Sequence, residues 1–362
     1  MTVLLSEAKL RSLGAGILLL VAAMVDPAAA FADKPKSIEE WKALYHRPKE
    51  IPFPADNPYD AAKAKLGEML FFDPRVSGAN YISCASCHNP SLSWGDGMPH
   101  GIGFGMSELP RRTPTVLNLA WSELLMWDGR KTSLEDQALG PMSTPAEMNA
   151  DLKKLPAKLA AIDGYREQFA SVFPDGLTLE NITKAIATYE RTIVSGTAPF
   201  DKWIAGDETA ISAAAKRGFM VFNTKGNCAA CHTGWNFTDN SFRDIGLSDN
   251  DIGRAKILDL PSMQHAFKTP TLRDVARRAP YMHNGSIPTL EAVIEHYDQG
   301  GVQRPSLSEE MKPLHLTTEE KADLVAFLET LTGEDAPVHV PVLYAGQNGA
   351  QRVSSNSRGN AK

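Results

Sequence analysis

Apolar residues recur at helical spacing in several segments of the chain. Within residues 178–194 they fall on one face, three or four positions apart, at Leu179, Ile182, Ile186, Tyr189 and Ile193. Residues 317–331 repeat this pattern with Leu324, Phe327, Leu328 and Leu331. Ser37 followed by Glu40 predicts a capped helix over 37–47, and Thr144-Pro145 is typical of the start of another. The pattern therefore predicts a mostly α-helical protein.

A weak internal repeat divides the chain into two parts. The segment 65–72 (KLGEMLFF) corresponds to 216–222 (KRGFMVF), and each lies ahead of a Cys-x-x-Cys-His motif. Long loops follow at 73–113 and 233–268, and loops of that length usually have a function or wrap a ligand. We expect two helical domains, at 33–195 and 196–335, with the helix at 317–331 returning to the first domain. A disordered tail is expected at 336–362.

The N-terminus has the features of a secretory signal peptide over residues 1–32. Lys9 and Arg11 precede an apolar run at 13–25 that is short for a membrane span, and Ala30-Phe-Ala32 fits a cleavage site. These features favour cleavage over an uncleaved anchor. No later stretch is long and apolar enough to cross a membrane, and a formal net charge of -6 gives no indication of nucleic-acid binding. We expect a periplasmic protein without a membrane span in its mature form.

All four cysteines lie in two motifs, Cys84/Cys87/His88 and Cys228/Cys231/His232. In such a motif two thiols attach one porphyrin, and the adjacent His ligates its iron. A zinc site would have to combine both motifs, and a thioredoxin-like site needs a βαβ unit that the sequence does not indicate. The motifs thus predict two covalently bound haem c groups, with His88 and His232 as proximal ligands. Residue types alone leave His, Met and Tyr as candidates for the sixth ligand.

Beyond these motifs, residues 58–333 resemble the bacterial dihaem cytochrome c peroxidase and MauG superfamily. The matching segments, in the order of the family, include 66–74, 113–118, 127–130, 134–137, 268–273 and 280–285. The resemblance implies two cytochrome c-like helical domains, an N-terminal haem that reacts with H2O2, and a C-terminal haem that passes electrons.

The resemblance also assigns residues to the site. Trp127 would lie between the haems, and Gln137, Pro141 and Glu147 would line the peroxide pocket, with Glu147 as the general base. Judged from the local sequence alone, Trp127 suits a core position and Glu147 suits the first turn of a helix.

Two positions favour the MauG-like branch of that superfamily. Peroxidases of the family carry a His that blocks the peroxide haem; this position is Phe104 here, with His100 nearby, and Phe cannot ligate iron. The distal ligand of the second haem falls on Tyr297, as in MauG-like proteins. On a helix, His296 would point about 100° away from it, and Met282 is a further candidate.

The function implied is that H2O2 forms a high-valent dihaem state, which oxidises a residue of a periplasmic partner protein. The expected target is a Trp, and the methanobactin-associated dihaem enzymes are one such subgroup. Two other functions stay open at this point. One is a dihaem peroxidase that reduces H2O2 with electrons from a small cytochrome c or cupredoxin. The other is a non-catalytic electron carrier.

The resemblance further implies a calcium ion between the domains. The matching carbonyls are those of Arg278 and Pro280, but the third position is Arg112, which cannot ligate a cation. The surface Trp through which MauG oxidises its partner is Gly226 here, which leaves Trp235 or Trp203 as exit points.

Overall fold

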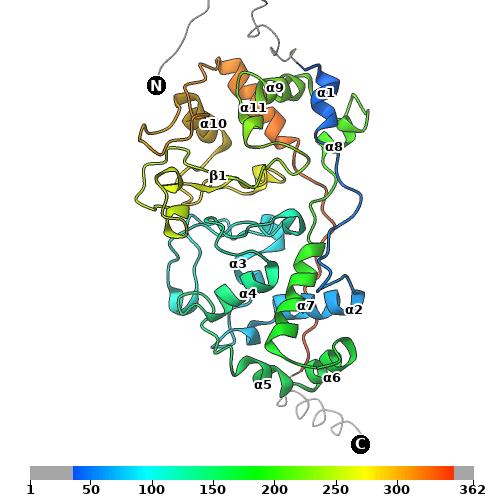
Figure 1. Ribbon diagram of the computed structural model, residues 1–362. Helices are drawn as coiled ribbons and strands as arrows, with labels where there is room; N and C mark the ends of the chain where they lie inside the picture. The colour runs from blue at the N-terminus through cyan, green and yellow to red at the C-terminus, as the bar shows by residue number, and fades with distance from the viewer. Residues whose placement is uncertain (1–35, 346–362) are drawn as a thin grey trace, which may run out of the picture. The chain divides into compact units, whose positions relative to one another are not determined.

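The computed structural model describes residues 36–345, and from Ile38 onward this part of the chain forms one compact unit (Figure 1). It is mostly helical, as the periodicity predicts. The helices are α1 (Ile38–Ala43), α2 (Ala61–Phe72), α3 (Cys84–Cys87), α4 (Leu134–Ser143), α5 (Leu155–Ala160), α6 (Asp163–Val172), α7 (Leu179–Thr192), α8 (Pro199–Ile204), α9 (Ala213–Asn223), α10 (Leu290–Gln299) and α11 (Thr318–Glu329). Two short antiparallel strands, β1 (Phe242–Arg243) and β2 (Phe267–Lys268), join the loops of the second part. Within residues 36–345 no helix is long and apolar enough to cross a membrane. The predicted signal peptide lies outside the described residues.

The internal repeat corresponds to two close helix crossings. Figure 1 shows α2 beside α7, and α9 beside α11. A Cβ atom at Gly67 of α2 would lie 1.9 Å from the carbonyl oxygen of Ala185 on α7. A Cβ atom at Gly218 of α9 would lie 1.9 Å from the carbonyl oxygen of Asp323 on α11. Each glycine therefore allows two helix backbones to approach more closely than any larger residue would permit.

These crossings organise two hydrophobic cores. The first core surrounds α2 and α7 and includes Leu70 and Phe169, and the second surrounds α9 and α11 and includes Phe219 and Phe327. In both cases the apolar face predicted from the sequence is the buried face. Some charged residues of these helices are buried as well, namely Glu190 and Arg191 of α7 and Asp323 of α11.

The helix expected over 37–47 is present as α1 but ends at Ala43, and two other predicted helices begin at a side-chain cap. Thr178 caps α7, and Thr317 caps α11 in a capping box with Glu320. The expected start at Thr144 is wrong, because the Thr144 N–H donates to the Gly140 carbonyl and ends α4. Pro145 cannot continue that helix, and residues 145–148 form a turn instead.

Both ends of the described chain pack on the opposite core. Tyr45, which follows α1, is fully buried in the second core, where its hydroxyl donates to Asn223 Oδ1 at 2.7 Å. Tyr344 packs its ring on Tyr165 of the first core, 5.0 Å between centroids, and its carbonyl accepts from Arg75 at 2.9 Å.

These contacts correct three expectations. The segment from α1 to Tyr45 belongs with the second core, although it was assigned to the first domain. The chain remains docked as far as Tyr344, so the expected disorder does not begin at residue 336; residues 346–362 lie outside the described part. α11 packs on α9, and it is the chain after α11 that returns to the first core. The boundary at residues 195 and 196 stays a prediction.

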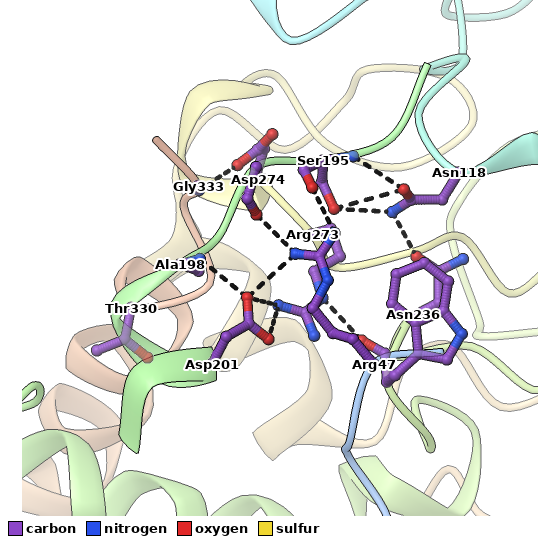
Figure 2. A network of polar contacts seen from close by, with 12 residues as sticks. Arg47, Asn118, Ser195, Ala198, Asp201, Asn236, Arg273, Asp274, Thr330 and Gly333 are labelled. Carbon is purple, nitrogen blue, oxygen red and sulfur yellow. Dashed lines mark hydrogen bonds and ion pairs between the residues drawn. The ribbon is translucent and has the colours of Figure 1, made fainter. Parts of the chain in front are cut away.

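A buried ion pair joins α8 to the second core (Figure 2). The Arg273 side chain is fully buried, and its Nη1 lies 2.8 Å from Asp201 Oδ1. Arg47 donates to the same carboxylate at 3.2 Å and to the Ser195 carbonyl at 2.5 Å. Asn118 extends this network, since its amide donates to Asn236 Oδ1 at 2.8 Å. Residues far apart in the sequence are thus linked by charge-assisted bonds.

We expect Asp201→Asn to lower the free energy of unfolding by about 3–5 kcal/mol, because it leaves the Arg273 charge buried without its carboxylate. Urea denaturation of the haem-loaded protein measures this change. Asp207→Asn, on the exposed turn after α8, is the matched control and should leave the midpoint unchanged. Equal midpoints for the two variants would contradict a stabilising role of the pair.

Candidate active site

A cavity of about 450 Å³, the first cavity, lies beside the first motif and is lined by Cys84, Cys87 and His88. His88 Nδ1 lies 3.2 Å from the Trp94 carbonyl oxygen, which can only accept, so Nδ1 carries the proton. Burial lowers the pKa of His88, which keeps the imidazole neutral. The unprotonated Nε2 is therefore available to ligate a metal.

The second motif is built in the same way around a cavity of its own, the second cavity, of about 190 Å³. Cys228, Cys231 and His232 line it, and His232 Nδ1 lies 2.9 Å from the Phe237 carbonyl oxygen. Burial again lowers the pKa of the His. Because each motif lines a separate cavity, the two do not combine as a shared zinc site would require.

Buried cations between the cavities fit a cofactor with acidic groups. Arg112 lines both cavities and Arg278 lines the second; both side chains are buried, and neither Nε atom has a hydrogen-bond partner among the described residues. Burial lowers the pKa of Arg278 to about 10 and that of Lys268, which also lines the second cavity, to about 8. Buried charges of one sign are costly without counter-ions. The propionates of two haems would supply them, so the residues present fit haem.

The predicted peroxide-pocket residues line the first cavity together. Gln137 and Pro141 lie four positions apart on α4 and so share a face, and Glu147 follows from the turn after that helix. Burial raises the pKa of Glu147, against the opposing charge of Arg130 and a hydrogen bond from Thr144. The turn is held in place because the Phe104 N–H donates to the Glu147 carbonyl at 2.8 Å. A carboxylate with a raised pKa in a cavity is suited to accept a proton and to return it.

The loop that would carry a blocking His leaves the first cavity open. The Phe104 ring stacks on Tyr81, 5.8 Å between centroids, and is not among the side chains that line the cavity in the described chain. His100 Nδ1 lies 2.5 Å from Glu108 Oε1, at the surface. Neither residue is among those that line the first cavity.

Tyr297 of α10 lines the second cavity together with His232. His296 does not line it, and its Nε2 lies 2.8 Å from the Ile245 carbonyl oxygen, so this rival is engaged elsewhere. Met282 does line the cavity and remains a rival. Burial raises the pKa of Tyr297, so its unligated form is a phenol; a ferric ion would favour the phenolate instead.

Trp127 lines both cavities. Its indole Nε1 donates to the Arg112 carbonyl at 2.8 Å, and its own carbonyl accepts from the Lys268 N–H at 2.8 Å. Trp127 is thus held by backbone groups of Arg112, which precedes the second motif, and of Lys268, which follows it.

Three further residues at the site had no role in the sequence prediction. His283 stacks on Phe267 with centroids 3.4 Å apart, lies 6.4 Å from the Trp127 ring, and has a pKa lowered to about 4 by burial. Glu190 of α7 lines the first cavity, and burial raises its pKa to about 8. Lys268 is the third. The signal for Glu190 was its place on the apolar face of a predicted helix, where a charged residue is unusual.

The calcium position predicted from the resemblance holds a guanidinium. Arg112 Nη2 donates to the Arg278 carbonyl oxygen at 2.6 Å, and this is one of the two carbonyls assigned to the ion. These residues do not fit calcium.

Comparisons with known proteins agree with this geometry. A family model described as di-haem cytochrome c peroxidase matches residues 61–209, and one described as cytochrome c matches residues 215–332. The methylamine utilization protein MauG of Methylorubrum extorquens is 52% identical over 307 residues, covering 83% of this chain and 87% of that protein. The protein of the same name from Methylophilus methylotrophus is 49% identical over 304 residues, covering 83% and 91%. The crystal structure of a MauG-like protein associated with microbial copper homeostasis superposes with a TM-score of 0.75 at 32% identity, covering 80% of this chain and 95% of that one.

Proposed function

Because the chain belongs to the dihaem cytochrome c peroxidase and MauG family, we propose that it is a MauG-like enzyme that uses H2O2 to oxidise a residue of a partner protein. The observation that carries this proposal is the pairing of an open first cavity, where Phe104 replaces a blocking His, with Tyr297 in the second cavity. Two haem c groups supply the redox chemistry. We place the reaction in the periplasm because of the signal-like residues 1–32.

At the first cavity, side chains of the protein transfer protons and restrict the space available to the substrate. Glu147 takes a proton from H2O2 and returns one to the departing oxygen, which assists heterolysis of the O–O bond. Gln137 and Pro141 restrict the space above the site, because their side chains face the same cavity from one side of α4. Calcium forms no part of this proposal.

Oxidising equivalents must then reach the surface. Trp203 is fully buried with Lys42 Nζ 4.6 Å from its ring centre, and a nearby positive charge opposes oxidation of the ring. Trp235 is half-buried and packs edge-on against Trp121, 4.7 Å between centroids, although Arg47 and Arg273 lie within 5.8 Å of it. We propose the Trp121–Trp235 pair as the exit, because both rings are partly exposed and Trp203 is not, with a Trp of the partner as the expected target.

Met282 in the second cavity favours a second candidate, a dihaem peroxidase that takes electrons from a small cytochrome c or cupredoxin. A Met ligand would give that haem a higher reduction potential.

One experiment separates the two candidate functions: one equivalent of H2O2 is added to the fully ferric protein, and optical and EPR spectra are followed. A long-lived oxidised state without prior reduction supports the MauG-like function. Reaction only after one-electron reduction supports the peroxidase.

We expect Trp127→Phe to leave the rate of the peroxide reaction unchanged and to remove most of the partner oxidation, because the aromatic bridge between the cavities is weakened. Stopped-flow spectra give the first quantity and mass spectrometry of the partner gives the second. Trp203→Phe changes a Trp that lines neither cavity and is the matched control. Equal partner oxidation by both variants would argue that Trp127 is only structural.

A further inference from the structure

We propose that the Arg112 guanidinium is a permanent internal cation that replaces the calcium ion at the junction of the two cavities. The protein would then need no divalent cation for its haem environments or stability. This inference depends on the geometry of the junction, and not on which substrate the enzyme oxidises.

The first argument is the occupied carbonyl. Arg112 is 5% exposed, and its Nη2 lies 2.6 Å from the Arg278 carbonyl oxygen. Calcium would need that oxygen at about 2.3–2.6 Å, which would place a dication directly beside a guanidinium. Two cations at such a distance repel strongly in a buried site. The guanidinium and the ion therefore exclude one another.

The second argument is the ligand count. Calcium takes about 6–8 oxygen ligands, and the sequence places an arginine where the family supplies the side-chain oxygen. Of the two matching carbonyls, one already accepts from Arg112. Of the three protein oxygens that the resemblance implies, only the Pro280 carbonyl would remain for the ion.

The third argument is that Arg112 links two segments of the site, through its backbone as well as through its guanidinium. Its N–H donates to the His283 carbonyl at 2.8 Å, and its carbonyl accepts from Trp127 Nε1 at 2.8 Å. With the bond to Arg278, one residue joins the loop after the first motif to the segment 278–283. It also fixes the ring that lines both cavities. A chelator cannot remove such a cation, because it is part of the chain.

Burial lowers the pKa of Arg112 and the charge of Asp96 opposes this effect. Arginine nevertheless stays protonated at physiological pH, since its ordinary pKa lies above 12. The Arg112 guanidinium therefore keeps its single positive charge at physiological pH, where a calcium site would hold two charges or none.

The test begins with the natural haem-loaded protein. We expect elemental analysis to find no stoichiometric calcium, and dialysis against EGTA to change neither the EPR spectrum nor the thermal midpoint. A bound calcium ion whose removal shifts either readout would overturn the proposal, and this measurement needs no variant.

Arg112→Asn then supplies an oxygen in place of the guanidinium. We expect its midpoint to fall by several degrees and its EPR signals to change, with both partly restored by millimolar CaCl2. Arg277→Asn is the matched control, since Arg277 is half exposed and pairs with Asp335 at 3.6 Å; it should not respond to CaCl2. If Arg112→Asn behaves as Arg277→Asn does, or is perturbed but not restored by CaCl2, the guanidinium does not stand in place of an ion.

Discussion

Replacing Tyr297 with Phe should abolish the long-lived oxidised state that H2O2 produces and reduce partner oxidation by about 100-fold or more. Removing a residue that only hydrogen-bonds to a metal ligand already lowers metal affinity or activity by about 10–100-fold, and loss of the ligand itself should cost at least as much. Tyr297 lines the second cavity together with His232, and His296 is engaged with the Ile245 carbonyl. A phenolate is an anionic oxygen donor, and it stabilises oxidised iron better than a thioether does. The substitution removes this oxygen and keeps the ring.

Optical and EPR spectra before and after one equivalent of H2O2 measure the effect. Tyr45→Phe is the matched control, because it removes a buried hydroxyl from the second core without touching either cavity. If Tyr297→Phe keeps the oxidised state, that state does not depend on the Tyr297 hydroxyl, and Met282 becomes the candidate ligand. Loss of the state in both variants would indicate general damage to the second core.

Glu147→Gln should slow the reaction with H2O2 by about 10²–10⁴-fold, the usual contribution of a general acid–base group. The amide keeps the size of the side chain but cannot accept the proton. Stopped-flow mixing with excess H2O2 gives the rate constant. Glu167→Gln, on the exposed face of α6, is the control and should react at the natural rate. A natural rate for Glu147→Gln would mean that another base acts.

The pH dependence of this step follows from the raised pKa of Glu147. The base is active when it is deprotonated, so the rate of the natural protein should fall as the pH falls through the folded-state pKa. Burial places that pKa above the ordinary value of Glu. The decline should therefore begin at a higher pH than for an exposed carboxylate, and Glu147→Gln should lose it.

Local features of this protein could be predicted from the sequence because they depend on neighbours in the chain. The spacing of Cys84, Cys87 and His88 already determines that the three side chains face one cavity. The apolar stripe of α7 likewise predicts which face is buried. Thr144 shows the limit of such patterns, since a Thr-Pro pair occurs both at helix starts and just after helix ends, and only the bond to Gly140 distinguishes them.

The assembly of the site and the packing of the chain ends depend on contacts between residues distant in the sequence, and no local pattern predicts such contacts. Gln137, Pro141 and Glu147 were assigned through family resemblance, and the structure places them around one cavity without testing their chemistry. The bond from Arg112 to Arg278 spans 166 residues, and the sequence indicated only that Arg112 cannot ligate calcium. Packing of both chain ends on the opposite cores was missed for the same reason.

That reciprocal packing makes the two repeats poor candidates for separate expression. A gene cut between residues 195 and 196 would give a first fragment without the Tyr344 ring against Tyr165, and a second fragment without Tyr45 in its aromatic core. Each fragment would expose an apolar surface that the other fragment's terminal segment covers in the intact chain. Although the sequence contains a weak internal repeat, each core depends on a segment from the other end of the chain, so we expect the two cores to unfold together.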